Sequence, residues 1–454
     1  GRINTDFIDN SAGVDTSDHE VNIKILLGLA VQRGELTMEA RNELLQSCVD
    51  DVVSHVLYDN YQQAQILSQE VEVSAQRIEA YEDLMQQLEA GEGELEREVE
   101  FLPSTEEMAD RRAAGEGLVR PELAVLLAYA KRAIFAALVT SELPDSPYLA
   151  EDLRTYFPPG IVERFGHLLE HHPLRRELIA TIVANDVVNA QGITFVSRMV
   201  TETGASPAEV VRAFRIARDV TGAVQRWADV EALDGLIDPR VQNELMTGVD
   251  WLVETSSRWY LVHAAGRHLA EAVGDARASF EELSAVIDQI GPETWREEHE
   301  HAARRLEAEG VPPALAKRHA FQAELVHGPD IITVAHATGR TVLEVTRAFF
   351  LLGERLQLDW LENQVEAMPG GSRWQRWALQ SMEDDLFTLR RTLAEAVLDE
   401  CGALPIDEAV DKFIESRADT FARLQRFMRS LAVDGMGDLA QLTVALRQIR
   451  SLIG

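Results

Sequence analysis

Apolar residues recur at helical spacing along nearly the whole chain, from about residue 16 onward. Val21, Ile23, Leu26 and Leu27 give the first such segment its apolar surface, and this periodicity predicts α-helix. Only residues Arg2 to Ile8 alternate loosely, with β-branched and aromatic members, before a turn at residues 9–13. This pattern predicts a short strand that ends in a turn. The fold class we expect is therefore mainly α.

Several helix starts are marked by local capping residues. Thr37 precedes a helical pattern, Ser104 and Glu107 are spaced as a capping box, and Pro121 has a first-turn position. Ser206-Pro207 followed by Glu209 combines a cap, a proline and a box. A helix from Thr37 is predicted to run past Tyr81, with its exposed end in the acidic segment 91–94.

The chain contains one internal similarity. Residues 195–232 include Glu-Val-Val-Arg-Ala-Phe, and residues 331–367 include Glu-Val-Thr-Arg-Ala-Phe. Each of these motifs follows a Gly-containing turn, and each segment continues to a tryptophan, Trp227 or Trp360. Two copies favour an old duplication of a helical unit, with chance similarity as the alternative. They are fewer than the stacked copies of a solenoid.

Composition narrows the possible functions. The chain has 454 residues and a formal net charge of −33, which disfavours binding to nucleic acid or anionic lipid. Cys48 and Cys401 lie far apart in sequence and fit a reducing compartment, so we expect a cytoplasmic location. The most apolar stretch, residues 123–139, is interrupted by Lys131 and Arg132, so no membrane span is expected.

The segment from Asn10 to Ser17 is the best candidate for chemistry. It contains small residues where the predicted strand gives way to a helix, and Thr16 or Ser17 is expected to cap that helix. A helix start offers free backbone N–H groups to a carboxylate or phosphate. The alternative, which the residues alone favour, is an ordinary capped turn.

Two other motifs carry less chemistry. Gly435-Met436-Gly437-Asp438-Leu439-Ala440 matches a dinucleotide-binding pattern, but it follows a helical pattern, and a helix end followed by a new cap is the better interpretation. His299 and His301 are two positions apart on a helix, so they point to different faces. We expect a solvated helix there and no metal site.

The residues from Gly1 to Leu27, which read GRINTDFIDNSAGVDTSDHEVNIKILL, resemble the segment that closes the catalytic domain of the large bacterial NAD-specific glutamate dehydrogenases. Residues 120–129, RPELAVLLAY, resemble the helical carboxy-terminal region of the same family. The resemblance implies the terminal strand and helix of a Rossmann-like catalytic domain over residues 1–34. Long helices and a linker over 35–118 and a helical domain over 119–454 would follow.

The resemblance also implies roles for individual residues. Smaller glutamate dehydrogenases have an Asn-Ala-Gly-Gly-Val-x-x-Ser pattern, on which Asn10, Gly13, Val14 and Ser17 fall in register. Asn10 would lie against the nicotinamide–ribose portion of NAD. Gly13, Val14 and Ser17 would line the glutamate pocket, with Ser17 reaching the side-chain carboxylate. The chain departs from the pattern at residues 11–12 and 18, which weakens the cofactor assignment more than the substrate assignment.

The expected function is that of the family: oxidative deamination of L-glutamate to 2-oxoglutarate and ammonium with NAD, by a homo-oligomer. This reaction needs a dinucleotide cradle, cations for the substrate carboxylates and an acid/base pair. The resemblance implies that these lie upstream, so NAD would be bound mainly by upstream sequence, this chain would hold no catalytic residue, and it would be inactive alone. The rival hypothesis is a non-catalytic helical scaffold or regulatory module.

Overall fold

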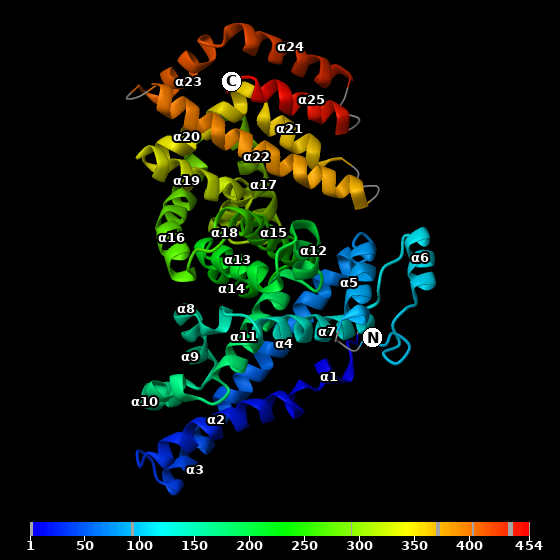
Figure 1. Ribbon diagram of the computed structural model, residues 1–454, viewed down its shortest axis with the longest axis vertical. Coiled ribbons are helices and arrows are strands. Elements are labelled where there is room, and N and C mark those ends of the chain that lie inside the picture. Colours follow the sequence, from blue (N-terminus) through cyan, green and yellow to red (C-terminus); the bar gives the residue numbers. More distant parts are fainter. Residues whose placement is uncertain are drawn as a thin grey trace. The chain divides into compact units, whose positions relative to one another are not determined.

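The computed structural model describes residues 3–91, 95–291, 293–368, 373–401, 404–434 and 439–453. Within these ranges every regular element is a helix and there is no strand (Figure 1). The chain forms two compact units: unit 1 comprises residues 1–216 and 260–270, and unit 2 comprises residues 217–259 and 271–454. The mainly α prediction is confirmed.

Unit 1 holds the helices α1 (Asp6–Asp9), η1 (Ser11–Gly13), α2 (Asp15–Gln32), α3 (Met38–Ser47), α4 (Val49–Val73), α5 (Ile78–Ala90), α6 (Thr105–Ala114), α7 (Arg120–Val139), η2 (Leu143–Asp145), α8 (Pro147–Ala150), α9 (Asp152–Tyr156), α10 (Pro159–Phe165), η3 (Gly166–His171), α11 (Arg175–Gln191), α12 (Phe195–Thr203) and most of α13 (Pro207–Val220). Its centre is α7, which packs against α4 and α11. Pro121 starts α7 as predicted, and Leu123, Leu126 and Leu127 are fully buried.

The predicted strand over Arg2 to Ile8 is wrong for the residues that the structure describes, and Arg2 lies outside them. Residues 3–5 are extended or irregular and α1 follows. The backbone carbonyl of Thr5 accepts hydrogen bonds from the N–H groups of Ile8 and Asp9, at 3.1 and 2.9 Å. A lone strand has no ladder partners for its backbone groups, whereas one helical turn satisfies them locally.

The single long helix predicted from Thr37 past Tyr81 is also wrong. Thr37 does cap α3, accepting a hydrogen bond from Ala40 N at 3.2 Å. The helix is then interrupted at Cys48 and again over residues 74–77, which separates α3, α4 and α5. At the second break the Ser74 hydroxyl is buried and donates to Leu118 O at 3.1 Å. The second break thus coincides with a contact to a distant segment, and residues 74–77 contain no proline or glycine.

The other end signals are partly confirmed. Helix α5 ends at Ala90, and residues 92–94 of the predicted exposed end lie outside the described residues. The capping box of Ser104 and Glu107 is present at the start of α6. Ser206 and Glu209 exchange the corresponding hydrogen bonds before α13, at 2.8 and 3.3 Å.

Unit 2 holds the helices α14 (Ala223–Glu231), α15 (Pro239–His263, to residue 259), α16 (Leu269–Val286), η4 (Ile287–Gln289), α17 (Glu293–Ala308), α18 (Pro313–Ala320), η5 (Gln322–His327), α19 (Gly328–Thr338), α20 (Val342–Leu356), α21 (Leu358–Glu366), α22 (Arg373–Cys401), α23 (Ile406–Glu415), α24 (Ala418–Asp434) and α25 (Leu439–Arg450). Helix α22 packs against α19, α20, α21, α23 and α25 and so organises the later part of the unit. A smaller apolar cluster, which includes Val230, Leu245 and Leu306, joins α14, α15 and α17.

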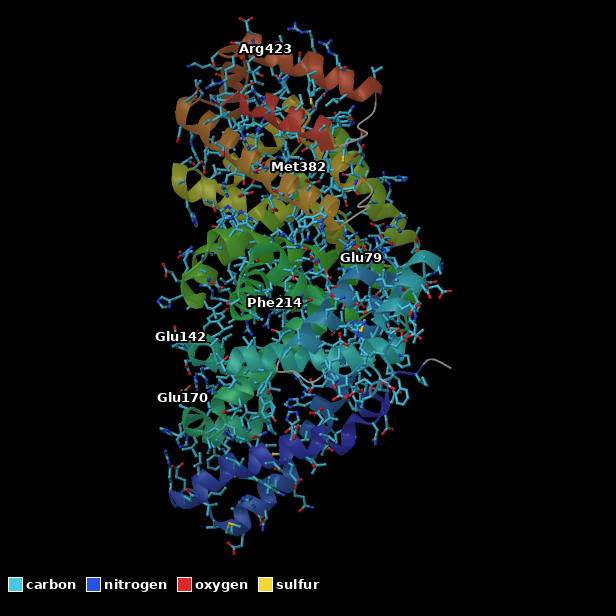
Figure 2. The ribbon with its side chains drawn as sticks, turned by 45° about the vertical axis from the view of Figure 1, so that its right-hand side comes forward. Glu79, Glu142, Glu170, Phe214, Met382 and Arg423 are labelled. Carbon is cyan, nitrogen blue, oxygen red and sulfur yellow. The ribbon has the colours of Figure 1, made fainter. Side chains whose placement is uncertain are left out.

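Figure 2 shows the side chains of both units, with the buried Phe214 and the exposed Glu142, Glu170 and Arg423 among those labelled. Phe214 and its counterpart in the internal similarity, Phe349, are both fully buried.

The two similar segments have the same local structure. The first contains α12, α13 and α14, and the second contains α19, α20 and α21. In each, a left-handed glycine, Gly204 or Gly339, ends the first helix. A left-handed residue, Gly222 or Gln357, precedes the third helix. These correspondences support the proposed duplication, which stays a prediction.

No single helix among the described residues is long and apolar enough to cross a membrane. Helices α11 and α12 pass the same test of length and composition only as a pair, with a bend of 90° between them.

Candidate functional site

The segment from Asn10 to Ser17 forms a continuous surface turn. Asn10 ends α1, Gly13 ends η1, and Val14 precedes α2. Asn10, Gly13, Val14 and Ser17 are all exposed. Helix α2 begins at Asp15 and has no side-chain cap, so the predicted cap at Thr16 or Ser17 is wrong and both residues lie in its first turn. The structure thus presents the four predicted binding residues together at the surface.

Arg120 connects this segment to α4. Its guanidinium donates to Ala64 O at 2.7 Å and to the Ser68 hydroxyl at 2.9 Å on α4, and also to the Asn4 side chain. Asn4 in turn donates through Nδ2 to the Asp9 carboxylate at 2.6 Å. The arginine that opens the Arg-Pro-Glu-Leu motif of the chain therefore helps to fix the opening turn. The sequence marked this motif without indicating that contact.

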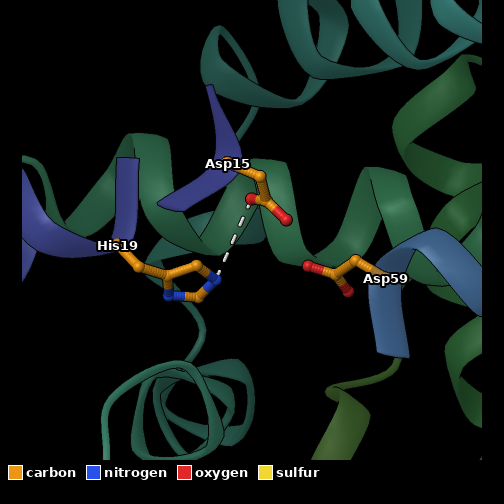
Figure 3. Close-up of side chains that lie close together, drawn as sticks. All are labelled: Asp15, His19 and Asp59. Atoms are coloured by element: carbon orange, nitrogen blue, oxygen red, sulfur yellow. Dashed lines mark ion pairs between the residues drawn. The ribbon is translucent and has the colours of Figure 1, made fainter. Parts of the chain in front are cut away.

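Behind the turn, α2 and α4 bring together a carboxylate–histidine cluster, which we define as Asp15, His19 and Asp59. One ligand-type atom of each residue lies within 4.8 Å of the others. His19 Nε2 is 3.9 Å from Asp15 Oδ1. Figure 3 shows the imidazole and the Asp59 carboxylate turned toward Asp15 from opposite sides. Among the described residues this is the only group of histidine, cysteine and acidic side chains close enough to share an ion.

Burial sets the electrostatics of this cluster. Burial and, to a smaller extent, nearby Asp15 raise the pKa of Asp59 to about 6, although Lys131 opposes both effects. The pKa of Asp15 is also raised, by burial and then by Asp18. Lys131 is partly buried, and burial lowers its pKa to about 8 despite the two carboxylates. The two carboxylates are therefore only partly neutralised.

His19 is held in an aromatic environment. Its ring stacks on Tyr156 with centroids 4.4 Å apart, and the His55 ring is 5.4 Å away. Burial, and then His55, lowers the pKa of His19 to about 4. The Tyr156 backbone opposes this shift. His19 Nδ1 makes no hydrogen bond of ordinary length and angle. The imidazole is thus neutral at physiological pH.

This cluster was not predicted from the sequence, for which no metal ligand was expected. Asp15 and His19 are four residues apart, so their shared helix face was readable from the sequence. Asp59 carried no such signal, because its position depends on how α4 packs against α2.

Unit 2 contains a second buried charge cluster around Arg390, which has no exposed side-chain surface. Arg390 lies 2.8 Å from Asp359 Oδ1 and 3.1 Å from Glu362 Oε1, and His327 Nε2 lies 3.4 Å from Glu362 Oε2. Burial tends to raise the pKa of Glu362, but Arg390 and His327 outweigh it and bring the pKa to about 2. This arrangement is a neutralised ion network.

The remaining sequence motifs add no binding site. His301 is exposed as expected, but His299 is largely buried and its Nε2 lies 3.2 Å from Glu324 Oε1, so the expectation of a wholly solvated helix is wrong there. Most of the dinucleotide-like motif, residues 435–438, lies outside the described residues, and Leu439 begins α25.

Comparison with known proteins connects both parts of the chain to one kind of protein. Residues 1–70 match the family model "Bacterial NAD-glutamate dehydrogenase, catalytic domain", and residues 115–451 match "Glutamate dehydrogenase, C-terminal". The first match continues past residue 34, where sequence analysis placed the end of the catalytic domain, and includes the whole carboxylate–histidine cluster.

Proteins named NAD-specific glutamate dehydrogenase align along the chain. The one from Halomonas elongata is 36% identical over 456 residues, covering 99% of this chain. Those from Pseudomonas aeruginosa and Mycobacterium tuberculosis are 37% and 33% identical and cover 100% of it. The chain spans 28% of the length of each of these relatives. It belongs to the glutamate dehydrogenase C-terminal family.

Proposed function

We propose that this chain is the C-terminal portion of an NAD-dependent enzyme that deaminates L-glutamate to 2-oxoglutarate and ammonium. The observation that carries the proposal is the order of the two matches, the catalytic domain first and the C-terminal region after it, in one chain. The names of the relatives support the same substrate and cofactor. NAD would be bound mainly by upstream sequence.

The geometry of the opening turn supports roles for its residues in binding. A side-chain carboxylate of glutamate at the start of α2 would meet free backbone N–H groups and the Ser17 hydroxyl. A Cβ atom added at Gly13 would have no neighbour within 4 Å, so the backbone there can be approached closely. Gly13, Val14 and Ser17 would line the substrate pocket, and Asn10 would contact the nicotinamide–ribose of NAD.

The same turn cannot bind an anionic substrate unaided. Asp15 and Asp18 lie in the first turn of α2, and both would repel a carboxylate. The cations that bind glutamate must then come from the remainder of the catalytic domain. This requirement agrees with the proposal that the chain supplies one wall of the site and no catalytic residue.

An exposed apolar stripe supports packing of this region against more protein. Val49, Val53 and Leu57 follow one face of α4 at four-residue spacing and are 54%, 45% and 63% exposed. Phe7 and Val14, within the same matched region, are 52% and 70% exposed. Contiguous exposed apolar surface usually marks an interface. We propose that the rest of the catalytic domain covers it, while the helical region braces that domain, builds subunit contacts in a homo-oligomer or gates the cleft.

The test compares the full-length product of the gene with this 454-residue chain, by following NAD reduction with glutamate as substrate. We expect activity only in the full-length protein. Activity in neither would favour the rival hypothesis of a helical scaffold or regulatory module, which no comparison supports better.

Ser17→Ala in the full-length protein tests the substrate pocket. Loss of a hydrogen bond to a charged group, worth about 1.5–3 kcal/mol, is expected to raise KM for glutamate roughly ten- to hundred-fold. Ser54→Ala is a matched control, because the Ser54 hydroxyl is exposed and donates only to Asp50 O of its own helix. Unchanged glutamate kinetics in Ser17→Ala would remove Ser17 from the pocket.

A further inference from the structure

The carboxylate–histidine cluster has the composition of a cation site. It supplies two carboxylate oxygens and one imidazole nitrogen, from two helices that pack together. Bonds of about 2.0–2.2 Å to one ion would place ligand atoms roughly 3–4 Å apart. The three atoms already lie within 4.8 Å of one another, so small side-chain rotations would complete the site.

His19 is a buried imidazole whose Nε2 makes no hydrogen bond to the Asp15 carboxylate that it faces. The residue is 3% exposed, and Nδ1 makes no hydrogen bond of ordinary length and angle, although the Tyr156 backbone acts on the ring. Nε2 faces Asp15 Oδ1 at 3.9 Å, which is too long for a hydrogen bond. Nε2 thus lies among two carboxylates without a hydrogen bond to Asp15, and an ion between them would bond to all three side chains.

The charge of the cluster is also unbalanced, with more negative than positive charge. Lys131 is the cation that interacts with both Asp15 and Asp59, and His55 acts on Asp15 as well. One lysine supplies a single positive charge to two carboxylates, whereas a divalent ion would supply two.

We propose that Asp15, His19 and Asp59 bind one divalent cation of the zinc and manganese class, which accepts mixed carboxylate and imidazole ligands. Two protein helices would then be joined at the turn that carries Ser17, and solvent would complete the coordination. The cation competes with Lys131 for the same oxygens. The proposal does not depend on glutamate or NAD, so it can fail while the proposed function stands, and the reverse also holds.

The experiment uses full-length protein freed of metal with a chelator and then titrated with Mn²⁺, followed by the loss of the free-ion electron paramagnetic resonance signal. Because the chain carries a net charge of −33, weak binding at many surface carboxylates is expected, and excess Mg²⁺ suppresses it. One Mn²⁺ per chain should remain bound under these conditions. Calorimetry with Zn²⁺ should give the same stoichiometry.

Variants locate the ion. His19→Gln and Asp59→Asn are each expected to weaken binding at least ten-fold, and His19→Gln should also remove the nitrogen coupling from the spectrum of bound Mn²⁺. His167→Gln is the matched control, since His167 is a half-exposed histidine that pairs with Glu35 at 2.9 Å elsewhere in unit 1. Lys131→Met should tighten binding several-fold, because it removes the competing cation.

Circular dichroism of each variant shows whether it folds. The absence of a bound stoichiometric ion in the wild-type protein would overturn the proposal and leave Lys131 as the partner of the two carboxylates. Binding that is equal in wild type, His19→Gln and Asp59→Asn would overturn it as well, because the ion would then lie elsewhere.

Discussion

Asp59 in unit 1 and Glu362 in unit 2 are carboxylates whose surroundings shift the pKa in opposite directions. In unit 2, Glu362 lies between Arg390 and His327, and these outweigh its burial to bring its pKa to about 2. In unit 1, burial and Asp15 together raise the pKa of Asp59 to about 6, and Lys131 does not offset them. The folded protein therefore stabilises the ionised form of Glu362 relative to water and destabilises the ionised form of Asp59.

The difference distinguishes an ion network that stabilises the fold from a cluster of carboxylates that repel each other. Arg390 reaches its partners from α22, the helix that contacts most of its neighbours in the later part of unit 2, so its pairs join α22 to α21. Asp15 and Asp59 instead bring two like charges together where α2 packs against α4. Their repulsion opposes the contact between the two helices. Unfavourable charge placement of this kind is concentrated at functional sites.

Removing the cation of the unit 2 network should have the largest effect. Arg390→Met removes a fully buried cation from the partly buried Asp359 and Glu362, and breaking a buried pair in this way costs up to about 3–5 kcal/mol. Urea denaturation followed by tryptophan fluorescence measures this loss. The fluorescence reports unit 2 specifically, since all seven tryptophans of the chain lie there.

Arg305→Met is the control for that prediction. Arg305 pairs with Glu244 at the surface, where the two side chains are 46% and 44% exposed. Such pairs contribute at most about 1 kcal/mol. An Arg390→Met variant no less stable than Arg305→Met would show that the buried network contributes little.

The comparison also shows which parts of the fold the sequence could predict. The caps at Ser104 and Ser206 were predicted correctly because a capping box involves residues only three positions apart. The strand over Arg2 to Ile8 failed because a strand depends on partners that its own residues do not specify. The break after α4 was missed because the contact between Ser74 and Leu118 joins residues distant in sequence.

The site follows the same rule. The segment from Asn10 to Ser17 was recognisable as a turn before a helix, and its binding role stays a prediction. The pairing of Asp15 with His19 was not predicted, although their helical spacing would have allowed it, and Asp59 enters only through packing. The Arg390 network was equally hidden, since its members come from η5, α21 and α22.

Acid should weaken unit 2 through Glu362. The folded-state pKa, about 2, lies below the ordinary 4.5, so the unfolded chain takes up the proton first as the pH falls. The stabilisation is complete above about pH 4.5 and is lost as the pH falls through 4.5 toward 2, by about 3 kcal/mol at most. The urea midpoint should decrease less between pH 6 and pH 3 in Glu362→Gln than in wild type. Parallel changes in the two proteins would contradict this assignment.

A satisfied carboxylate in unit 1 tests whether the contrast belongs to the clusters or to the units. Glu70 is buried and accepts hydrogen bonds from the Tyr81 hydroxyl and from Ile193 N, the latter at 2.7 Å. In Gly192→Ala the new Cβ would lie 2.0 Å from Glu70 Oε1, and the backbone φ of +85° disfavours alanine. We expect the free energy of unfolding of unit 1 to fall by about 2 kcal/mol, measured as faster hydrogen exchange in α4 and α11.

Gly28→Ala is the opposite control in the same unit. Gly28 lies inside α2, and an added Cβ would meet nothing within 4 Å. Alanine should therefore stabilise α2 by about 0.5–1 kcal/mol. Equal losses in the two variants would indicate that hydrogen exchange reports the helices in general and not the Glu70 contact.

The smallest expected effect is also the one that distinguishes the clusters by sign. Asp59→Asn keeps the shape of the side chain but removes one of two repelling carboxylates, and with a chelator present it should stabilise unit 1 by about 1 kcal/mol. Glu362→Gln should instead destabilise unit 2, because Arg390 loses a buried partner. Hydrogen exchange in α2 and α4 measures the first change and tryptophan fluorescence the second. Glu43→Gln, on the exposed face of α3, should change neither by more than about 0.5 kcal/mol. A loss of stability in Asp59→Asn would mean that its attraction to Lys131 exceeds its repulsion from Asp15, so that both clusters serve the fold.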